Sequence, residues 1–327
     1  MSNQRKLDRE ITRRRMLTAS AGIVAGTVAA GHVPALLADE QAGDVPDLDK
    51  HPWIDAHSHI WSRDVAKYPL ANGNTVDNLS PPSFTDEELL ALAHASGVGR
   101  VVLIHHHPYH GWDNSYLVDT AARSPRTFRV VGTVDNREPD PGRRMRAMLA
   151  QHVTGFRITP RFNEGKWLDG GMDEMWETAA DTGQNMSCLI DPSHFAEVGA
   201  MCAKHPDTPV VIDHFGRIGV DGEIRDADVD ALCALARHKH VAVKASAYYA
   251  LGKKQAPYLD LLPMFRRVLD AYGPERVMWA TDCPYQLSGE NTYDDSIALV
   301  RDHMDFLSTG DRQAILRNTA ERVYLFV

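Results

Sequence analysis

Eight short apolar segments alternate with amphipathic segments along most of the chain, and this alternation limits the choice of fold more than any other feature. Each segment is a nearly continuous apolar run, which is typical of parallel strands that are buried on both faces. The predicted strands are 53–57, 100–105, 128–134, 154–158, 186–190, 209–213, 240–245 and 276–281. The predicted helices between and after them are 85–95, 114–123, 142–151, 171–182, 194–204, 226–238, 260–272 and 291–307, with a last helix at 310–323.

Eight strand–helix pairs predict an α/β fold, a single (β/α)8 TIM barrel over residues 52–327. The first of these helices begins with a capping box, Thr85 and Glu88. A doubly wound open sheet is the competing fold, but no glycine-rich dinucleotide turn follows the first strand. In a barrel the active site forms at the carboxyl ends of the strands, so polar residues at those ends are the candidates.

The first 38 residues have a different character. Arg13, Arg14 and Arg15 precede a mildly apolar stretch rich in Ala, Gly and Thr, and small residues follow as cleavage options. This pattern predicts a twin-arginine signal peptide over 1–38, with the twin-arginine export machinery as a partner and a periplasmic or secreted location. The alternatives are a disordered basic terminus or a membrane anchor, although the run is short and polar for a stable membrane span. Residues 39–51 form an acidic lead-in segment.

The charge balance limits the classes of binding partner that can be expected. The formal net charge is −9 and residues 1–38 carry +4, so the remainder carries −13. An acidic body argues against nucleic acid or an anionic membrane as a partner, and a small-molecule substrate is expected. The four cysteines form no CxxC pair, which favours free thiols.

Two histidines one residue apart, His57 and His59, end the first strand. Side chains alternate along a strand, so Asp55, His57 and His59 are predicted to point the same way. Two imidazoles on one face can share a metal ion or bind a carbonyl oxygen, and the alternative is a pair of hydrogen-bonded core histidines.

Other polar residues also gather at the predicted strand ends, which indicates a site. Each has a structural alternative: a solvated loop for the histidine run, a helix cap for Asp191, and ion pairs for Lys244 and the arginines. These candidates are His105, His106, His107, Arg157, Arg161, Asp191, His194, Asp213, His214, Arg217, Lys244, Tyr248 and Asp282.

Three motifs together resemble the amidohydrolase superfamily, and more narrowly the lactonase-like branch of amidohydrolase family 2. They are Asp55-x-His57-x-His59, Val211–Gly216 and Ala280–Pro284. The resemblance covers about residues 52–327 and implies that His57, His59 and Asp282 hold a metal ion or line its vacated place. It also implies that Asp282 activates water and that His214 contacts substrate or water.

The resemblance further implies that arginines hold a substrate carboxylate or polarise its carbonyl, with loop residues setting the specificity. The expected substrate-binding residues are Arg157, Arg161, Arg217, His106 and Tyr248.

One departure from the family pattern concerns the metal. Metal-dependent relatives present a histidine or a carboxylated lysine from the fourth or fifth strand, whereas here the fifth strand ends at Leu189–Pro192 without one. We therefore expect either one divalent metal ion, with zinc favoured, or metal-independent chemistry.

The thin ligand set favours hydrolysis of an electrophilic ester. The expected activity is opening of the lactone ring of a small sugar-acid or aromatic-degradation-type carboxylated lactone, with water activated by Asp282. The alternatives are a zinc-dependent non-oxidative decarboxylase of the same family and a catalytically silent periplasmic binding protein.

Overall fold

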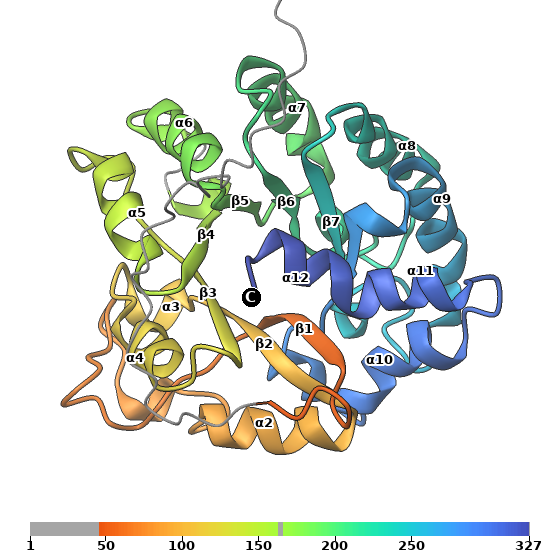
Figure 1. The fold of residues 1–327 in the computed structure, drawn as a ribbon, viewed down its shortest axis with the longest axis horizontal. Coiled ribbons are helices and arrows are strands. Elements are labelled where there is room, and N and C mark those ends of the chain that lie inside the picture. Colours follow the sequence, from red (N-terminus) through yellow and green to blue (C-terminus); the bar gives the residue numbers. More distant parts are fainter. Residues whose placement is uncertain (1–45, 163–165, 327) are drawn as a thin grey trace, which may run out of the picture. The chain divides into compact units, whose positions relative to one another are not determined.

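The computed structural model of the protein describes residues 46–162 and 166–326. Within them, eight parallel strands lie side by side in chain order and form a nearly closed barrel (Figure 1). The strands are β1 (Trp53–Ser58), β2 (Val98–Ile104), β3 (Phe128–Gly132), β4 (Val153–Ile158), β5 (Asn185–Cys188), β6 (Val210–Ile212), β7 (Val241–Ala245) and β8 (Val277–Trp279).

Most helices surround the strands as an outer ring, whereas α12 lies across one end of the barrel (Figure 1). The helices are α2 (Asp86–Ala95), α3 (His107–His110), α4 (Ser115–Arg123), α5 (Pro141–Leu149), α6 (Met172–Thr182), α7 (Phe195–Lys204), α8 (Asp226–Ala234), α9 (Leu262–Tyr272), α10 (Tyr293–Asp302), α11 (Thr309–Gln313) and α12 (Thr319–Val323). This is the predicted (β/α)8 TIM barrel.

The predicted elements agree with the observed ones to within a few residues, except near the C-terminus. The predicted capping box of α2 is confirmed, since Thr85 and Glu88 bond each other's backbone N–H groups. The predicted helix 291–307 stops at Asp302, and 310–323 is divided by a π-helical segment at Ala314–Asn318. The predicted export segment and the first part of the lead-in lie outside the described residues. No helix within the described ranges has the length and apolar character needed to cross a membrane.

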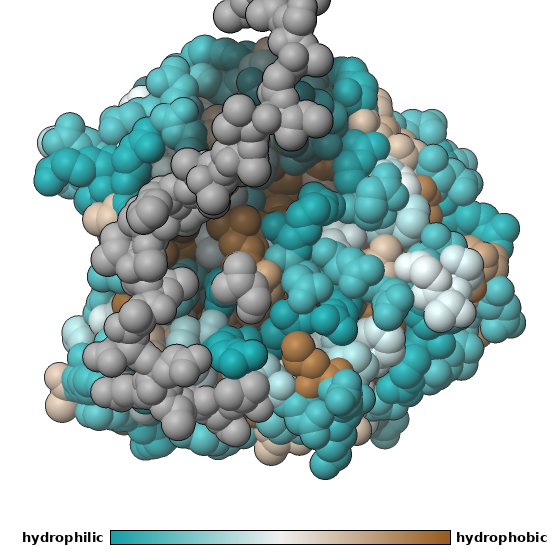
Figure 2. Space-filling model, in the orientation of Figure 1, coloured by the Kyte–Doolittle hydropathy of each residue, from teal (hydrophilic) through white to brown (hydrophobic). Residues whose placement is uncertain are grey.

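Two apolar clusters pack the molecule. The larger one lies between the strands and the helices, and the smaller one fills the barrel interior. The smaller cluster includes Ala320, Tyr324 and Phe326, so the C-terminal segment closes one end of the barrel, where α12 lies in Figure 1. Figure 2 shows that the surrounding helices are mostly hydrophilic on this face.

A β-bulge in β1 determines which way its polar residues point. Between Asp55 and Ser58 the chain advances three residues while β2 advances only two, from Val101 to Leu103. Such an extra residue re-aims the side chains that follow it. Asp55, before the bulge, points outward, where its carboxylate accepts a hydrogen bond from Tyr293 of α10, whereas the bulge allows His57 to point into the barrel. The prediction that Asp55, His57 and His59 share one face is therefore wrong, because simple alternation ignores the bulge.

The same carboxylate joins the first strand to the last. Asp55 Oδ1 accepts the backbone N–H of Thr281 at 3.0 Å, and Oδ2 accepts the Thr281 hydroxyl at 2.5 Å. Ser58 adds a hydroxyl donor to Asp55 at 2.8 Å and a backbone bridge to Cys283. The two ends of the sheet thus meet at the point where His57 and Asp282 enter the barrel.

Candidate active site

A pocket of about 360 Å³ opens at the carboxyl ends of the strands. Its walls combine imidazole and guanidinium groups with apolar and aromatic side chains, and the carboxylate of Asp282 is among them. The residues that line it are His59, His105, His106, His107, Pro108, Arg157, Thr159, Arg161, Phe162, Leu189, His214, Arg217, Val220, Ala247, Tyr249, Ala250, Leu251, Asp282 and Tyr285.

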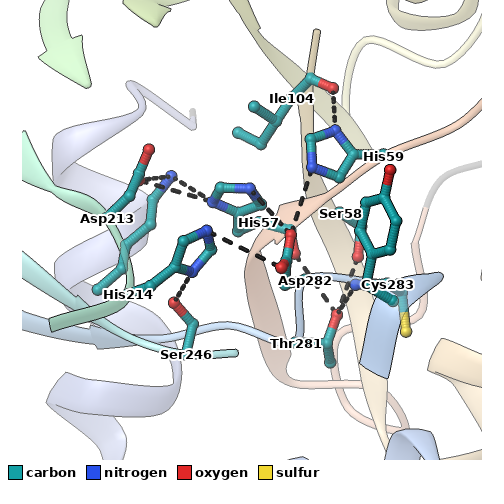
Figure 3. Close-up of polar contacts among 12 residues, drawn as sticks. His57, Ser58, His59, Ile104, Asp213, His214, Ser246, Thr281, Asp282 and Cys283 are labelled. Atoms are coloured by element: carbon teal, nitrogen blue, oxygen red, sulfur yellow. Dashed lines mark hydrogen bonds and ion pairs between the residues drawn. The ribbon is translucent and has the colours of Figure 1, made fainter. Parts of the chain in front are cut away.

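Three histidines surround the carboxylate of Asp282, as Figure 3 shows. Asp282 Oδ1 lies 3.4 Å from Nε2 of His57 and 3.3 Å from Nε2 of His59, and Oδ2 lies 3.9 Å from Nε2 of His214. Asp282 is 6% exposed and has a positive φ of 69°, a left-handed conformation uncommon for a residue with a side chain. The structure thus brings together the four residues that the sequence singled out as catalytic.

The hydrogen bond at the far side of His59 decides which nitrogen carries its proton. His59 Nδ1 lies 2.8 Å from the carbonyl oxygen of Ile104, which accepts hydrogen bonds and does not donate them. Nδ1 of His59 is therefore the protonated nitrogen, and the neutral ring directs the lone pair of Nε2 at Asp282. Two acceptors facing each other at 3.3 Å define a place for a proton or a cation.

His57 lies between the Arg157 guanidinium and a buried ion pair. Nη2 of Arg157 donates to Nε2 of His57 at 2.8 Å, because a guanidinium has only donors. On the other side, Nδ1 of His57 lies 3.6 Å from Asp213 and 3.3 Å from Lys244 Nζ. Lys244 and Asp213 are both fully buried and 3.0 Å apart. Lys244 therefore has the ion-pair role that was its structural alternative.

His214 follows β6 in a left-handed stretch of backbone. The φ angles of His214, Phe215 and Arg217 are all between 52° and 59°, and this turn directs His214 at Asp282. Its Nδ1 lies 2.8 Å from the hydroxyl of Ser246, which follows β7, and its ring centroid is 4.4 Å from that of His57. Ser246 was absent from the sequence prediction, because a lone serine after a strand carries no distinguishing signal.

Burial sets the charge of the imidazoles. Desolvation lowers the pKa of His59 to about 3 and that of His214 to about 4, and it lowers the pKa of His57 well below its usual value. These rings are therefore neutral at neutral pH. Burial likewise raises the pKa of Asp282, against the opposing effects of His214 and the Tyr249 hydroxyl.

The ion pair beneath His57 is also affected by burial. Desolvation alone would raise the pKa of Asp213, but the charge of Lys244 and the contacts of His57 and Arg157 lower it well below its usual value. The positive charge at this end of the barrel therefore comes from arginine and lysine side chains rather than from histidine.

The remaining predicted substrate-binding residues lie around the pocket, with one exception. Arg161 is exposed at the rim, and Nε of Arg217 is paired with Asp191 at 2.6 Å. His106 shares a hydrogen bond of 2.5 Å with the hydroxyl of Tyr285. His105, in contrast, lines the pocket but is fully buried, with Nε2 directed at the carbonyl oxygen of Asp113.

Tyr248 is the exception, and the structure corrects this assignment. Its side chain is fully buried outside the pocket, and its hydroxyl donates to the carbonyl oxygen of Ala245. The next residue, Tyr249, lines the pocket instead and donates to Oδ2 of Asp282 at 2.7 Å. Two adjacent tyrosines in a loop give no periodicity that would tell them apart. His194 also lies away from the pocket, against Trp167.

The site contains a donor set that fits a divalent cation. His57, His214 and Asp282 offer ligand atoms that all lie within 4.8 Å of one another, a set that differs from the predicted one by having His214 in place of His59. Imidazole nitrogen and carboxylate oxygen are ligands that zinc prefers. One contact opposes such binding, since Arg157 already donates to His57 Nε2, and an ion bound at that nitrogen requires the guanidinium to move.

A parallel barrel that gathers a buried carboxylate, three imidazoles and several arginines at the carboxyl ends of its strands has the architecture of a barrel hydrolase. The family model described as amidohydrolase matches residues 54–326. The chain therefore belongs to amidohydrolase family 2.

Similar proteins of established name include lactone hydrolases. The chain is 31% identical over 244 residues to an L-fucono-1,5-lactonase of Burkholderia ambifaria, covering 71% of this chain and 80% of the relative. It is 28% identical over 243 residues to a 4-sulfomuconolactone hydrolase of Rhizobium radiobacter, covering 73% and 77%. These similarities identify the protein as a lactonase-like hydrolase.

A solved structure also matches closely. An amidohydrolase of Burkholderia multivorans with bound zinc superimposes with a TM-score of 0.68 at 25% identity, covering 84% of this chain and 99% of the other. Zinc is thus found in a protein of the same fold and family.

Proposed function

We propose that the protein hydrolyses the ring ester of a small anionic lactone, with Asp282 accepting the proton of the attacking water. The observation that carries the proposal is that a base and a cationic donor meet at one atom. Nε2 of His57 lies 3.4 Å from Asp282 Oδ1 and 2.8 Å from Arg157 Nη2. Arg157 and Asp282 both line the pocket, so a carbonyl group bound there shares one cavity with the base and the cationic donor.

The proposed reaction balances within these groups. Water attacks the lactone carbonyl carbon as Asp282 Oδ1 takes its proton, and the guanidinium of Arg157 stabilises the oxyanion. The bond between the carbonyl carbon and the ring oxygen then breaks, and the leaving oxygen takes the proton from Asp282. The product is a hydroxy acid. Burial, which raises the pKa of Asp282, brings the carboxyl group closer to the pH at which such a base can also return its proton.

Charge in the pocket supports a negatively charged substrate. Among the described residues, three arginines line it, Arg157, Arg161 and Arg217, and one carboxylate, Asp282, although the whole chain has a net charge of −9. Planar guanidinium groups bind carboxylates in a bidentate manner. A carboxylated lactone of the sugar-acid or aromatic-degradation type fits this charge, and the names of the lactone-hydrolysing relatives agree with it at the level of the reaction.

We propose further that this hydrolysis proceeds without a metal ion, because Arg157 supplies positive charge at the nitrogen that a metal would bind. If a divalent ion is held, His57, His214 and Asp282 are its ligands. Such an ion would polarise a carbonyl and lower the pKa of a bound water. The same cluster makes a zinc-dependent decarboxylase the second candidate function, and the zinc-bound relative favours testing it.

We also propose that the protein is periplasmic or secreted. Residues 1–38 carry the twin-arginine pattern, and we propose that they direct export of the folded enzyme to the periplasm or beyond it. A fusion of residues 1–45 to a reporter protein that is active only after export tests this directly. Replacing Arg13 and Arg14 with lysine should abolish export, and continued export would contradict the assignment.

The function is tested with a panel of lactones before and after chelation. The panel contains a carboxylated pyrone, a sulfonated muconolactone, a neutral sugar lactone and, for the second candidate, a hydroxylated benzoate. We expect ring opening of an anionic lactone, unchanged after treatment with EDTA and removal of the chelator. Release of carbon dioxide from the benzoate, lost on chelation, would establish the decarboxylase instead.

The variant Asp282→Asn separates an enzyme from a binding protein. Removal of the base should lower kcat by about 10³-fold or more, whereas calorimetric affinity for the anionic lactone should change little. Absence of turnover in both the wild type and the variant, together with tight binding in both, would support the silent binding protein.

A further inference from the structure

The carboxylate of Asp282 is buried, and it has only one hydrogen-bond donor among the described residues. That donor is the hydroxyl of Tyr249, 2.7 Å from Oδ2. Asp282 is 6% exposed, so protein atoms enclose most of its surface. The orientation of a buried carboxylate depends on the donors around it, because rotation about its terminal bond is otherwise soft.

The histidines around Asp282 are poor candidates for holding the carboxylate in place. Nε2 of His59 directs a lone pair at Oδ1, because its proton is on the nitrogen that donates to Ile104. Nε2 of His57 accepts from Arg157 and so also presents no proton to Oδ1. His214 approaches Oδ2 only to 3.9 Å, beyond hydrogen-bond distance.

We propose that Tyr249 is a positioning residue for the reaction: its hydroxyl holds Oδ2 of Asp282, so that Oδ1 faces the histidines and the attacking water. Tyr249 thus acts through Asp282 on the geometry of proton transfer. The inference rests on the proposed function in so far as Asp282 is the base of that reaction.

The loop after β7 places the Tyr249 hydroxyl beside Asp282. Ala247 has a left-handed backbone with a φ of 56°, which is unfavourable for a residue with a side chain and turns the chain sharply. Before the turn, Ser246 contacts His214. After it, Tyr248 is directed into the core and Tyr249 to the pocket. One short loop therefore supports two of the groups that surround the reacting atoms.

The adjacent tyrosines provide a matched pair of variants. Tyr249→Phe and Tyr248→Phe each remove one hydroxyl and one hydrogen bond, of 2.7 Å to Asp282 and of 3.0 Å to a backbone carbonyl. Each variant is assayed for kcat and KM with the anionic lactone that the wild type opens fastest. Each is also analysed for thermal unfolding and by crystallography.

We expect Tyr249→Phe to lower kcat by about 10- to 100-fold with KM within about threefold, since one donor to a charged group is lost. Its crystal structure should show the Asp282 carboxylate rotated or in two orientations. Tyr248→Phe should lose thermal stability to a similar or greater degree but keep its kcat and its Asp282 orientation.

Two results would overturn the inference. One is wild-type kcat in Tyr249→Phe, and the other is an unchanged Asp282 carboxylate in its crystal structure. If the wild-type protein opens no lactone at all, the proposed function fails. The crystallographic comparison then still decides whether Tyr249 positions the carboxylate.

Discussion

The carboxylate of Asp55 accepts the backbone N–H of His57 at 3.0 Å, and this bond holds the bulge that turns His57 into the barrel. The same oxygen accepts the N–H of Thr281, the residue before the proposed base. Asp55 therefore lies outside the pocket and still places a residue on each side of it. In the sequence it reads as the first member of a ligand motif, yet its contacts are those of a structural clamp.

Replacement of Asp55 should destabilise the folded protein. In Asp55→Asn an amide NH2 takes the place of one oxygen and faces the N–H or hydroxyl groups that donate to that oxygen, so we expect a loss of about 2–4 kcal/mol in the free energy of unfolding. Activity should fall as well, because His57 loses its support. Urea unfolding measures the effect, with the exposed Asp77→Asn as the control. Equal stability of the two variants would contradict the role assigned to Asp55.

Stability should also depend on pH through the buried histidines. Burial lowers the pKa of His59 and His105 to about 3, of His106 to about 2 and of His214 to about 4. The unfolded chain takes up these protons below about pH 6.5 and the folded protein does not, so folding is favoured above pH 6.5 and weakened as the pH falls. Between its pKa in the folded protein and about pH 6.5, each histidine contributes up to about 1.4 kcal/mol per pH unit to this loss of stability.

Urea unfolding at pH 7.5 and pH 5.5 measures this dependence. We expect a clearly lower urea midpoint at pH 5.5 than at pH 7.5. In His105→Gln, the dependence of the free energy of unfolding on pH should be weaker by about one proton. The exposed His240→Gln is the matched control and should keep the wild-type slope. Identical midpoints at the two pH values would contradict the burial argument.

The charge of the substrate can be tested at the rim of the pocket. Arg161 is exposed there, so its replacement by methionine should leave folding intact. We expect Arg161→Met to raise KM for a carboxylated lactone by about tenfold, because one ion-pair contact is lost. KM for a neutral sugar lactone should stay unchanged. The exposed Arg143→Met serves as a control for surface charge. An equal change for both lactones would argue against a carboxylate contact.

Arg157 and a metal ion should compete for the same nitrogen. In Arg157→Met the Nε2 lone pair of His57 is free and one positive charge is gone, so we expect zinc to bind at least about tenfold more tightly than in the wild type. Isothermal titration with zinc alone measures this without reference to turnover. Arg217→Met, whose arginine is paired with Asp191, should bind zinc as the wild type does. Unchanged affinity in Arg157→Met would show that the guanidinium does not exclude the ion.

Much of the fold was predictable because buried parallel strands are encoded as short apolar runs. The strand at 154–158 was placed to within one residue of β4, in which Arg157 lies between the outward-facing Phe156 and Ile158. Alternation failed at β1, where the chain has an extra residue between Asp55 and Ser58 and the Asp55 carboxylate is bonded to Thr281, 226 positions away. Local periodicity contains no information about such a distant bond.

The site was predictable to the extent that its residues stand at strand ends. His57, His59 and Asp282 do, and the structure brings them into contact. Tyr249 lies in a loop whose direction is set by the left-handed backbone of Ala247. An alanine in the sequence does not indicate a left-handed backbone.

The bond between Asp55 and Thr281 spans 226 positions of the chain. A growing polypeptide that has made β1 already carries both histidines, but it has neither the proposed base, Asp282, nor Thr281, the distant partner of the Asp55 carboxylate. Under the proposed mechanism, hydrolysis therefore requires that the final strand has docked onto the first. A fragment that lacks that strand is expected to be inert however well the rest of it folds.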